Sequence, residues 1–105
     1  MNTRGQLDGT VGRYKLRLFI TGSTPRSTRA IQNMRQICDE SLKGRYDLEV
    51  IDVYDAPEAT KELQIIATPT LVKVLPEPLR RIIGDLSDKE RVLAGLDILP
   101  LKSGD

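Results

Sequence analysis

The sequence predicts a single mixed α/β domain. Apolar and β-branched runs of strand length alternate with stretches of helical periodicity along the chain, a pattern typical of strands connected by helices. With 105 residues, 39% of them hydrophobic, the chain can fill one core and not two. We therefore place one domain at residues 13–100, between a polar, glycine-rich and flexible N-terminal extension (1–12) and a short C-terminal tail (101–105).

The first half of the domain predicts a β-α-β unit. Apolar and charged residues alternate from Tyr14 to Ile20, which predicts a strand with one face on the core. Thr24 can cap the N-terminus of a helix and Pro25 fits its first position. The apolar positions of this helix recur at three- and four-residue steps as far as Leu42, and Gly44 is placed to end it. A second strand over 48–53 would then pair in parallel with the first.

The second half predicts a short helix, two antiparallel strands and a last helix. Asp55 and Glu58 have capping-box spacing, and three apolar residues then predict a short helix: Ala59, Leu63 and Ile66. Strands are expected over 71–75 and 79–83, separated by two prolines. Ser87 and Glu90 form a second capping box before a final apolar stripe: Val92, Leu93, Leu96 and Leu99. The resulting order is β-α-β-α-β-β-α.

The run Ile66-Ala67-Thr68-Pro69-Thr70-Leu71 resembles the cis-proline loop of thioredoxin-like folds. In those folds the reactive cysteines follow the first strand, but here that place reads Thr21-Gly22-Ser23-Thr24-Pro25-Arg26-Ser27. The resemblance implies the scaffold of a redox enzyme without its chemistry. A cis Thr68-Pro69 bond would leave a backbone edge open to a partner or ligand.

Composition argues against several classes of function. Sixteen Lys and Arg against 15 Asp and Glu give a net charge of +1, which provides no overall field for nucleic acid or an acidic membrane. The chain has no histidine and one cysteine, so we expect no transition-metal site, no catalytic residues and no cofactor. Cys38 lies on the apolar side of the first helix, where it fills the core. No apolar block of signal-peptide or membrane-span length occurs, which favours the cytoplasm.

Several polar side chains have both a structural and a functional interpretation. The hydroxyls of Ser23, Thr24 and Ser27 either cap the first helix or bind a thiol or anion. Cations on several elements either form solvated surface or a basic interface for an acidic partner: Arg26, Arg29, Arg35, Lys43, Arg80 and Arg81. Acidic residues in the second half are the candidate counterpart: Asp85, Asp88, Glu90 and Asp97.

The last predicted helix contains residues that oppose it. Gly95 costs about 1 kcal/mol relative to alanine inside a helix, and Asp97 brings a negative charge to the C-terminal end, where the helix dipole disfavours it. Residues 93–99 are also apolar enough to form a strand. Either tertiary packing compensates for the weak helix, or the C-terminal half has two packings of similar free energy.

The chain closely resembles the KaiB family of bacterial circadian-clock proteins over residues 14–99. The resemblance rests on the runs at 22–27, 50–53, 67–71 and 73–76, and above all on Arg80-Arg81-Ile82-Ile83-Gly84-Asp85-Leu86-Ser87-Asp88 with Gly95-Leu96-Asp97. It implies a non-enzymatic regulator with two folds: a homotetrameric ground state of order β-α-β-β-α-α-β, expected in crystals, and a rare thioredoxin-like monomer that binds a KaiC-like ATPase.

The resemblance also implies roles for individual residues and partners. Four residues would bear on the fold switch: Thr68, Pro69, Gly95 and Asp97. Six would lie at a partner or oligomer interface: Arg29, Lys43, Arg80, Arg81, Gly84 and Asp85. A KaiA-like protein or a histidine kinase would be a further partner, whereas nucleic acid and membranes would not.

Two departures from the family keep alternatives open. The chain lacks the acidic C-terminal extension common in cyanobacterial clock members and carries a polar N-terminal extension, which suggests a relative outside a complete clock, acting in stress adaptation. A different class is a glutathione-binding enzyme, with Thr68-Pro69 on the peptide backbone and a hydroxyl near Ser23 on the thiol. A third is an oligomeric adaptor with a single fold.

Overall fold

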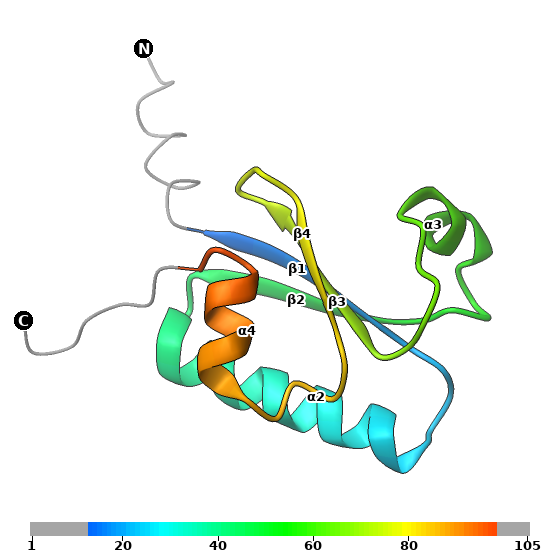
Figure 1. Ribbon diagram of the computed structural model, residues 1–105, viewed down its shortest axis with the longest axis horizontal. Helices are drawn as coiled ribbons and strands as arrows, with labels where there is room; N and C mark the ends of the chain where they lie inside the picture. Colours follow the sequence, from blue (N-terminus) through cyan, green and yellow to red (C-terminus); the bar gives the residue numbers. More distant parts are fainter. Residues whose placement is uncertain (1–12, 99–105) are drawn as a thin grey trace, which may run out of the picture.

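A computed structural model describes residues 13–98, and these residues form the seven elements predicted from the sequence (Figure 1). In chain order they are β1 (Tyr14–Ile20), α2 (Pro25–Ile37) continued by a π-helical turn η1 (Cys38–Leu42), β2 (Tyr46–Asp52), α3 (Pro57–Glu62), β3 (Thr70–Leu75), β4 (Arg80–Ile83) and α4 (Lys89–Gly95). The expected N-terminal extension (1–12), the C-terminal tail (101–105) and the end of the domain at residue 100 lie outside the described residues.

The four strands form one sheet in the order β2-β1-β3-β4. β1 pairs in parallel with β2, whereas β3 is antiparallel to both β1 and β4. This is the thioredoxin-like arrangement, and the order β-α-β-β-α-α-β, which the resemblance assigns to a tetramer, is not the one adopted here. The predicted α/β fold class is confirmed.

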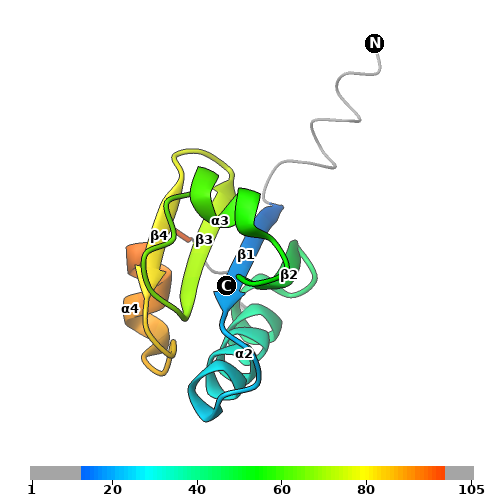
Figure 2. The same ribbon diagram turned by 90° about the vertical axis from the view of Figure 1, so that its right-hand side faces the viewer.

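The hydrophobic core lies between one face of the sheet and two helices. Alternate strand residues such as Leu16, Leu18 and Leu71 are fully buried on this face. Met34 of α2 and Val92 of α4 pack against them. Figure 2 shows α2 and α4 below the sheet, whereas α3 lies apart from both. In Figure 1, α3 lies beyond the end of the sheet where β1 and β2 finish and β3 begins.

The predicted start of α2 is confirmed in detail. The backbone N–H of Ser27 donates to Oγ1 of Thr24 at 3.1 Å, and Pro25 occupies the first turn. The helix then widens into η1, which the sequence pattern did not predict. Lys43 and Gly44 both have positive φ (43° and 86°) and end the helical segment where Gly44 was expected to end it.

The two capping boxes predicted in the second half are wrong. α3 begins after Ala56, which makes no side-chain cap, and it ends at Glu62, so Ile66 is not part of it. α4 is capped by Asp88, whose side chain accepts from the N–H of Arg91 at 3.2 Å. Asp88 supplies the carboxylate one residue nearer the helix than Ser87, so it takes the capping position.

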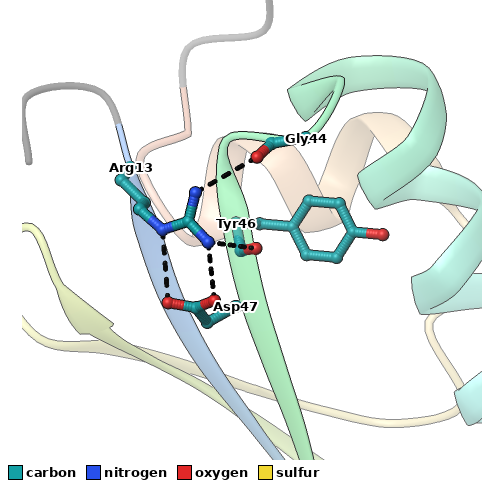
Figure 3. Close-up of polar contacts among 4 residues, drawn as sticks. All are labelled: Arg13, Gly44, Tyr46 and Asp47. Carbon is teal, nitrogen blue, oxygen red and sulfur yellow. Dashed lines mark hydrogen bonds and ion pairs between the residues drawn. The ribbon is translucent and has the colours of Figure 1, made fainter. Parts of the chain in front are cut away.

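Arg13 fastens the beginning of β1 to the beginning of β2 (Figure 3). Its guanidinium donates to both carboxylate oxygens of Asp47, with Nη2 to Oδ1 at 2.7 Å and Nε to Oδ2 at 3.3 Å. It also reaches the carbonyls of Gly44 and Tyr46. This two-pronged contact fixes the parallel register at the end of the sheet remote from α3.

Candidate docking surface at the cis-proline loop

The Thr68-Pro69 peptide bond is cis, and the loop around it is held on two sides. The hydroxyls of Thr21 and Thr68 share a hydrogen bond of 2.6 Å, which joins the turn after β1 to the residue before the proline. On the other side, the N–H of Gly84 donates to the carbonyl of Pro69 at 2.9 Å. The loop therefore connects the first half of the chain to the end of β4.

The turn between β1 and α2 uses its polar groups for structure. The N–H of Gly22 donates to Oδ2 of Asp52 at 3.0 Å, and Oγ of the buried Ser27 donates to the carbonyl of Thr21 at 3.4 Å. Thr24 caps α2. These contacts agree with the capping interpretation of the hydroxyls.

A surface hollow of about 750 Å³ lies beside the cis-proline loop, and its lining joins α3 to the segments on either side of it. Its lining residues are Val53, Tyr54, Pro57, Thr60, Lys61, Gln64, Ile65, Ile66 and Arg81. A second hollow of about 200 Å³ continues toward Thr21 and Thr68. Tyr54 and Ile66 are 77% and 87% exposed, which are large exposed fractions for large apolar side chains in a folded domain. We call this region the docking surface.

Arg81 holds α3 in place from the neighbouring strand β4. Its Nη1 donates to the carbonyl of Leu63 at 2.6 Å and to that of Gln64 at 3.2 Å. These carbonyls follow the last turn of α3, where backbone acceptors lack helical partners. Arg81, predicted to face a partner, thus caps a helix and lines the docking surface at the same time.

The other predicted interface residues do not gather in one patch. Arg29 pairs with Asp85 (Nε to Oδ2, 3.7 Å), and Arg80 pairs with Asp97 (Nε to Oδ2, 3.5 Å). Lys43 lies at the end of η1. Two of the predicted basic residues, Arg29 and Arg80, therefore pair with two of the predicted acidic residues within the chain.

Gly95 lies in the last helix, as predicted, whereas Asp97 lies beyond the end of that helix. Gly95 is the last residue of α4, and Asp97 lies beyond the helix with φ of 60°, a left-handed backbone that aspartate tolerates better than most residues. Asp97 therefore does not oppose the dipole from within the last turn. It follows the C-cap residue Leu96.

The surroundings of two titratable side chains, Cys38 and Asp85, shift their pKa values. Burial raises the pKa of the Cys38 thiol to about 12, as expected of a core filler. The pKa of Asp85 lies below its usual range, because its carboxylate accepts hydrogen bonds from Ser87 and lies near Arg29 and Arg26. Within residues 13–98 no three potential metal ligands gather, and no helix there is both long and apolar enough to cross a bilayer.

Sequence reasoning missed Tyr54 and Ile66. Ile66 was assigned to the buried stripe of a helix, but α3 ends four residues earlier. The signal was the pair Ile65-Ile66 directly before the cis-proline run, because adjacent apolar residues in an extended segment point to opposite sides and one of them faces solvent.

Curated relatives match most of the chain. A clock oscillator protein KaiB from Prochlorococcus marinus strain MIT 9312 is 55% identical over 86 residues, covering 82% of each chain. The protein of the same name from Nostoc punctiforme is 51% identical over 94 residues, covering 88% of this chain and 90% of its own.

Solved structures confirm the fold. The N-terminal domain of SasA from Synechococcus elongatus superposes with a TM-score of 0.66 at 27% identity, covering 78% of this chain and 79% of its own. Mitochondrial thioredoxin 3 from Saccharomyces cerevisiae gives a TM-score of 0.67 at 17% identity, covering 92% and 89%. The KaiB domain model matches residues 17–98, nearly all of the described fold. The chain belongs to the KaiB family.

Proposed function

We propose that this chain is a non-enzymatic, cytoplasmic regulator that binds a KaiC-like ATPase through the docking surface, and that it does so in the thioredoxin-like arrangement described here. The observation that carries the proposal is the exposure of Tyr54 and Ile66 beside the hollow. Its relatives are named as circadian clock oscillator proteins, which supports a regulatory role in such a clock.

The chemistry of the docking surface suits a protein partner. Large apolar side chains that project from a surface act as anchors when a partner buries them, and they dominate the binding energy of many interfaces. Lys61 and Arg81 are among the residues that line the hollow, and they add positive charge. A partner segment with apolar anchors and a carboxylate would complement both features.

The proposal includes a second fold for the C-terminal half. Three non-glycine residues in that half have positive φ: Gln64 (56°), Leu86 (63°) and Asp97 (60°). Such conformations cost of order 1–3 kcal/mol each when the side chain disfavours them, and Leu86 is a buried leucine, whose apolar side chain has no group that could hydrogen-bond to its own backbone. This strain supports a second packing of similar free energy.

Binding would then act as a population shift. A partner that binds the thioredoxin-like arrangement alone pulls the population toward it by its differential affinity. A homotetramer built from the other arrangement opposes this by mass action, so dilution speeds capture by the ATPase. The same physics serves a circadian clock or a stress response, and the partner decides between them. The alternative of a glutathione-binding enzyme gains no support from these contacts, since the hydroxyl of Thr68 shares a hydrogen bond with that of Thr21, and the hydroxyls of Thr24 and Ser27 bond to each other.

The test is binding of this chain to a KaiC-like ATPase, measured by native mass spectrometry or size-exclusion chromatography. We expect Ile66→Ala to weaken binding by about tenfold or more, as for an anchor residue. Leu79→Ala is the matched control, because Leu79 is 38% exposed on the β3–β4 connection, away from the hollow. Equal losses in the two variants, or no binding by the wild type, would refute the proposal.

A further inference from the structure

Lys73 is a charged residue in the core of the domain. It lies in the middle of β3 on the same face as Leu71, and only 1% of its surface is exposed. In the sheet it pairs with Leu16 of β1 on one side and with Arg80 of β4 on the other. The side chain of Lys73 therefore lies between an apolar side chain and a second cation.

The ammonium of Lys73 is poorly compensated within residues 13–98. It donates one hydrogen bond, from Nζ to the carbonyl of Pro76 at 2.9 Å, although an ammonium has three donors. The carboxylate of Asp97 lies near enough to interact with this ammonium through space, but it pairs with Arg80. Like charges directly opposite each other on antiparallel strands are destabilising, and Lys73 and Arg80 form such a pair.

Electrostatics agrees with the geometry. Burial lowers the pKa of Lys73, Asp97 partly offsets this, and Arg80 adds to it. Across the other strand the paired residue is Leu16, which carries no charge. Burying a charge that is not fully paired and hydrogen-bonded is unfavourable, so this arrangement of the chain is disfavoured by its own lysine.

We propose that the buried ammonium of Lys73 keeps the thioredoxin-like arrangement scarce, so that a packing which returns this amine to water is favoured until a partner binds. This inference rests on the two-fold equilibrium of the proposed function and assigns its balance to one residue. Lys73 then acts as a built-in bias against the binding-competent state, and the partner has to overcome it.

The test compares Lys73→Met with Lys15→Met in the full chain by two-dimensional NMR at fixed, dilute concentration. Methionine keeps the length and flexibility of lysine without its charge. Lys15 is the control, because it is an exposed lysine on the adjacent strand β1. We expect Lys73→Met to raise the ratio of thioredoxin-like to alternative resonances about 5- to 30-fold and Lys15→Met to leave it unchanged.

A pH series on the wild type gives a second readout. Because the pKa of Lys73 is lowered in the thioredoxin-like arrangement, the penalty is present when the amine is protonated. It disappears as the pH rises toward the ordinary lysine value of about 10.4. The thioredoxin-like fraction should therefore increase with pH in the wild type, and this slope should be smaller in Lys73→Met.

The outcomes separate the inference from the function on which it rests. Two sets of resonances with equal ratios in Lys73→Met and Lys15→Met would overturn the role of Lys73 and leave the two-fold equilibrium standing. A single set in every variant and at every concentration would remove the equilibrium itself, and the inference with it.

Discussion

Replacing Gly95 by alanine tests how the end of α4 sets the balance between the two proposed packings. Gly95 is helical, so alanine should gain about 1 kcal/mol of helix propensity. A Cβ atom there would lie 3.1 Å from Cδ1 of Ile82 on β4, closer than the ~3.5–4.0 Å at which carbon atoms pack best. Ile82 has to move, and an off-rotamer side chain costs about 0.5–1.5 kcal/mol.

The two terms nearly offset each other, so Gly95→Ala alone should favour the thioredoxin-like arrangement by about 0.5 kcal/mol at most. Ile82→Val removes the Cδ1 atom that the new Cβ would meet. In the Ile82→Val background the same substitution should gain the full propensity, about 1 kcal/mol, or about a fivefold change in population. The structure thus predicts a coupling between residues 82 and 95.

The assay is a double-mutant cycle, in which NMR gives the ratio of the two sets of resonances and circular dichroism reports the helix content. Each Gly95→Ala variant is compared with its own background, because Ile82→Val alone costs about 0.5–1.5 kcal/mol. An equal or smaller gain in the Ile82→Val background would show that the contact does not limit the effect. A loss in both backgrounds would refute the reasoning that glycine weakens this helix.

Three further predictions concern polar contacts of individual side chains. Thr68→Val removes the hydroxyl that bonds to Thr21 at 2.6 Å, and it should lower the free energy of unfolding by about 0.5–1.5 kcal/mol in urea titrations. Asn33→Asp removes the Nδ2 donor to the carbonyl of Asp85 at 2.8 Å and places a carboxylate against it, so we expect a loss of about 1–3 kcal/mol by the same assay. Gln36 and Lys89 hold the pKa of Glu40 below its usual range, as hydrogen bonds from Ser87 do for Asp85. Their stabilisation is therefore complete above the unfolded pKa values, about 4, and it is lost as the pH falls through the lowered folded values; thermal unfolding between pH 6 and pH 2 measures this loss.

Controls keep these predictions specific. Gln32→Glu adds the same charge to the exposed side of α2 one residue away, and it should change stability far less than Asn33→Asp. A double variant, Glu40→Gln with Lys89→Gln, should show a shallower pH dependence than the wild type. If that variant lost stability at acidic pH as steeply as the wild type does, the Glu40–Lys89 pair would contribute nothing measurable to the pH dependence of stability.

The order of elements was predictable because each one carries its own local signal. The alternation in β1, the cap at Thr24 and the apolar stripe of α2 act within a few residues, so the sequence alone specifies them. The cis-proline run likewise fixed the position of the loop between α3 and β3.

The parts that were not predicted depend on contacts between distant residues. α3 ends at a local turn in which Gln64 has a φ of 56°, and Arg81, almost twenty residues later, donates to the carbonyls that follow the helix, a contact that only the tertiary fold supplies. Asp88 replaces Ser87 as the cap, a difference of one residue that spacing does not resolve. The pairing of Arg29 with Asp85 and of Arg80 with Asp97 needs the tertiary fold, and the spacing of these residues in the sequence does not reveal it.

The hydrogen bonds from Arg81 to the carbonyls after α3 make the docking surface conditional on β4. If β4 left the sheet, the carbonyls of Leu63 and Gln64 would lose their donor, and the segment that carries Ile66 would lose this support. A chain that has rearranged only part of its second half would therefore present no complete surface. A partner would then bind only those copies of the chain in which β4 is part of the sheet. Copies that have rearranged only in part would not bind it prematurely.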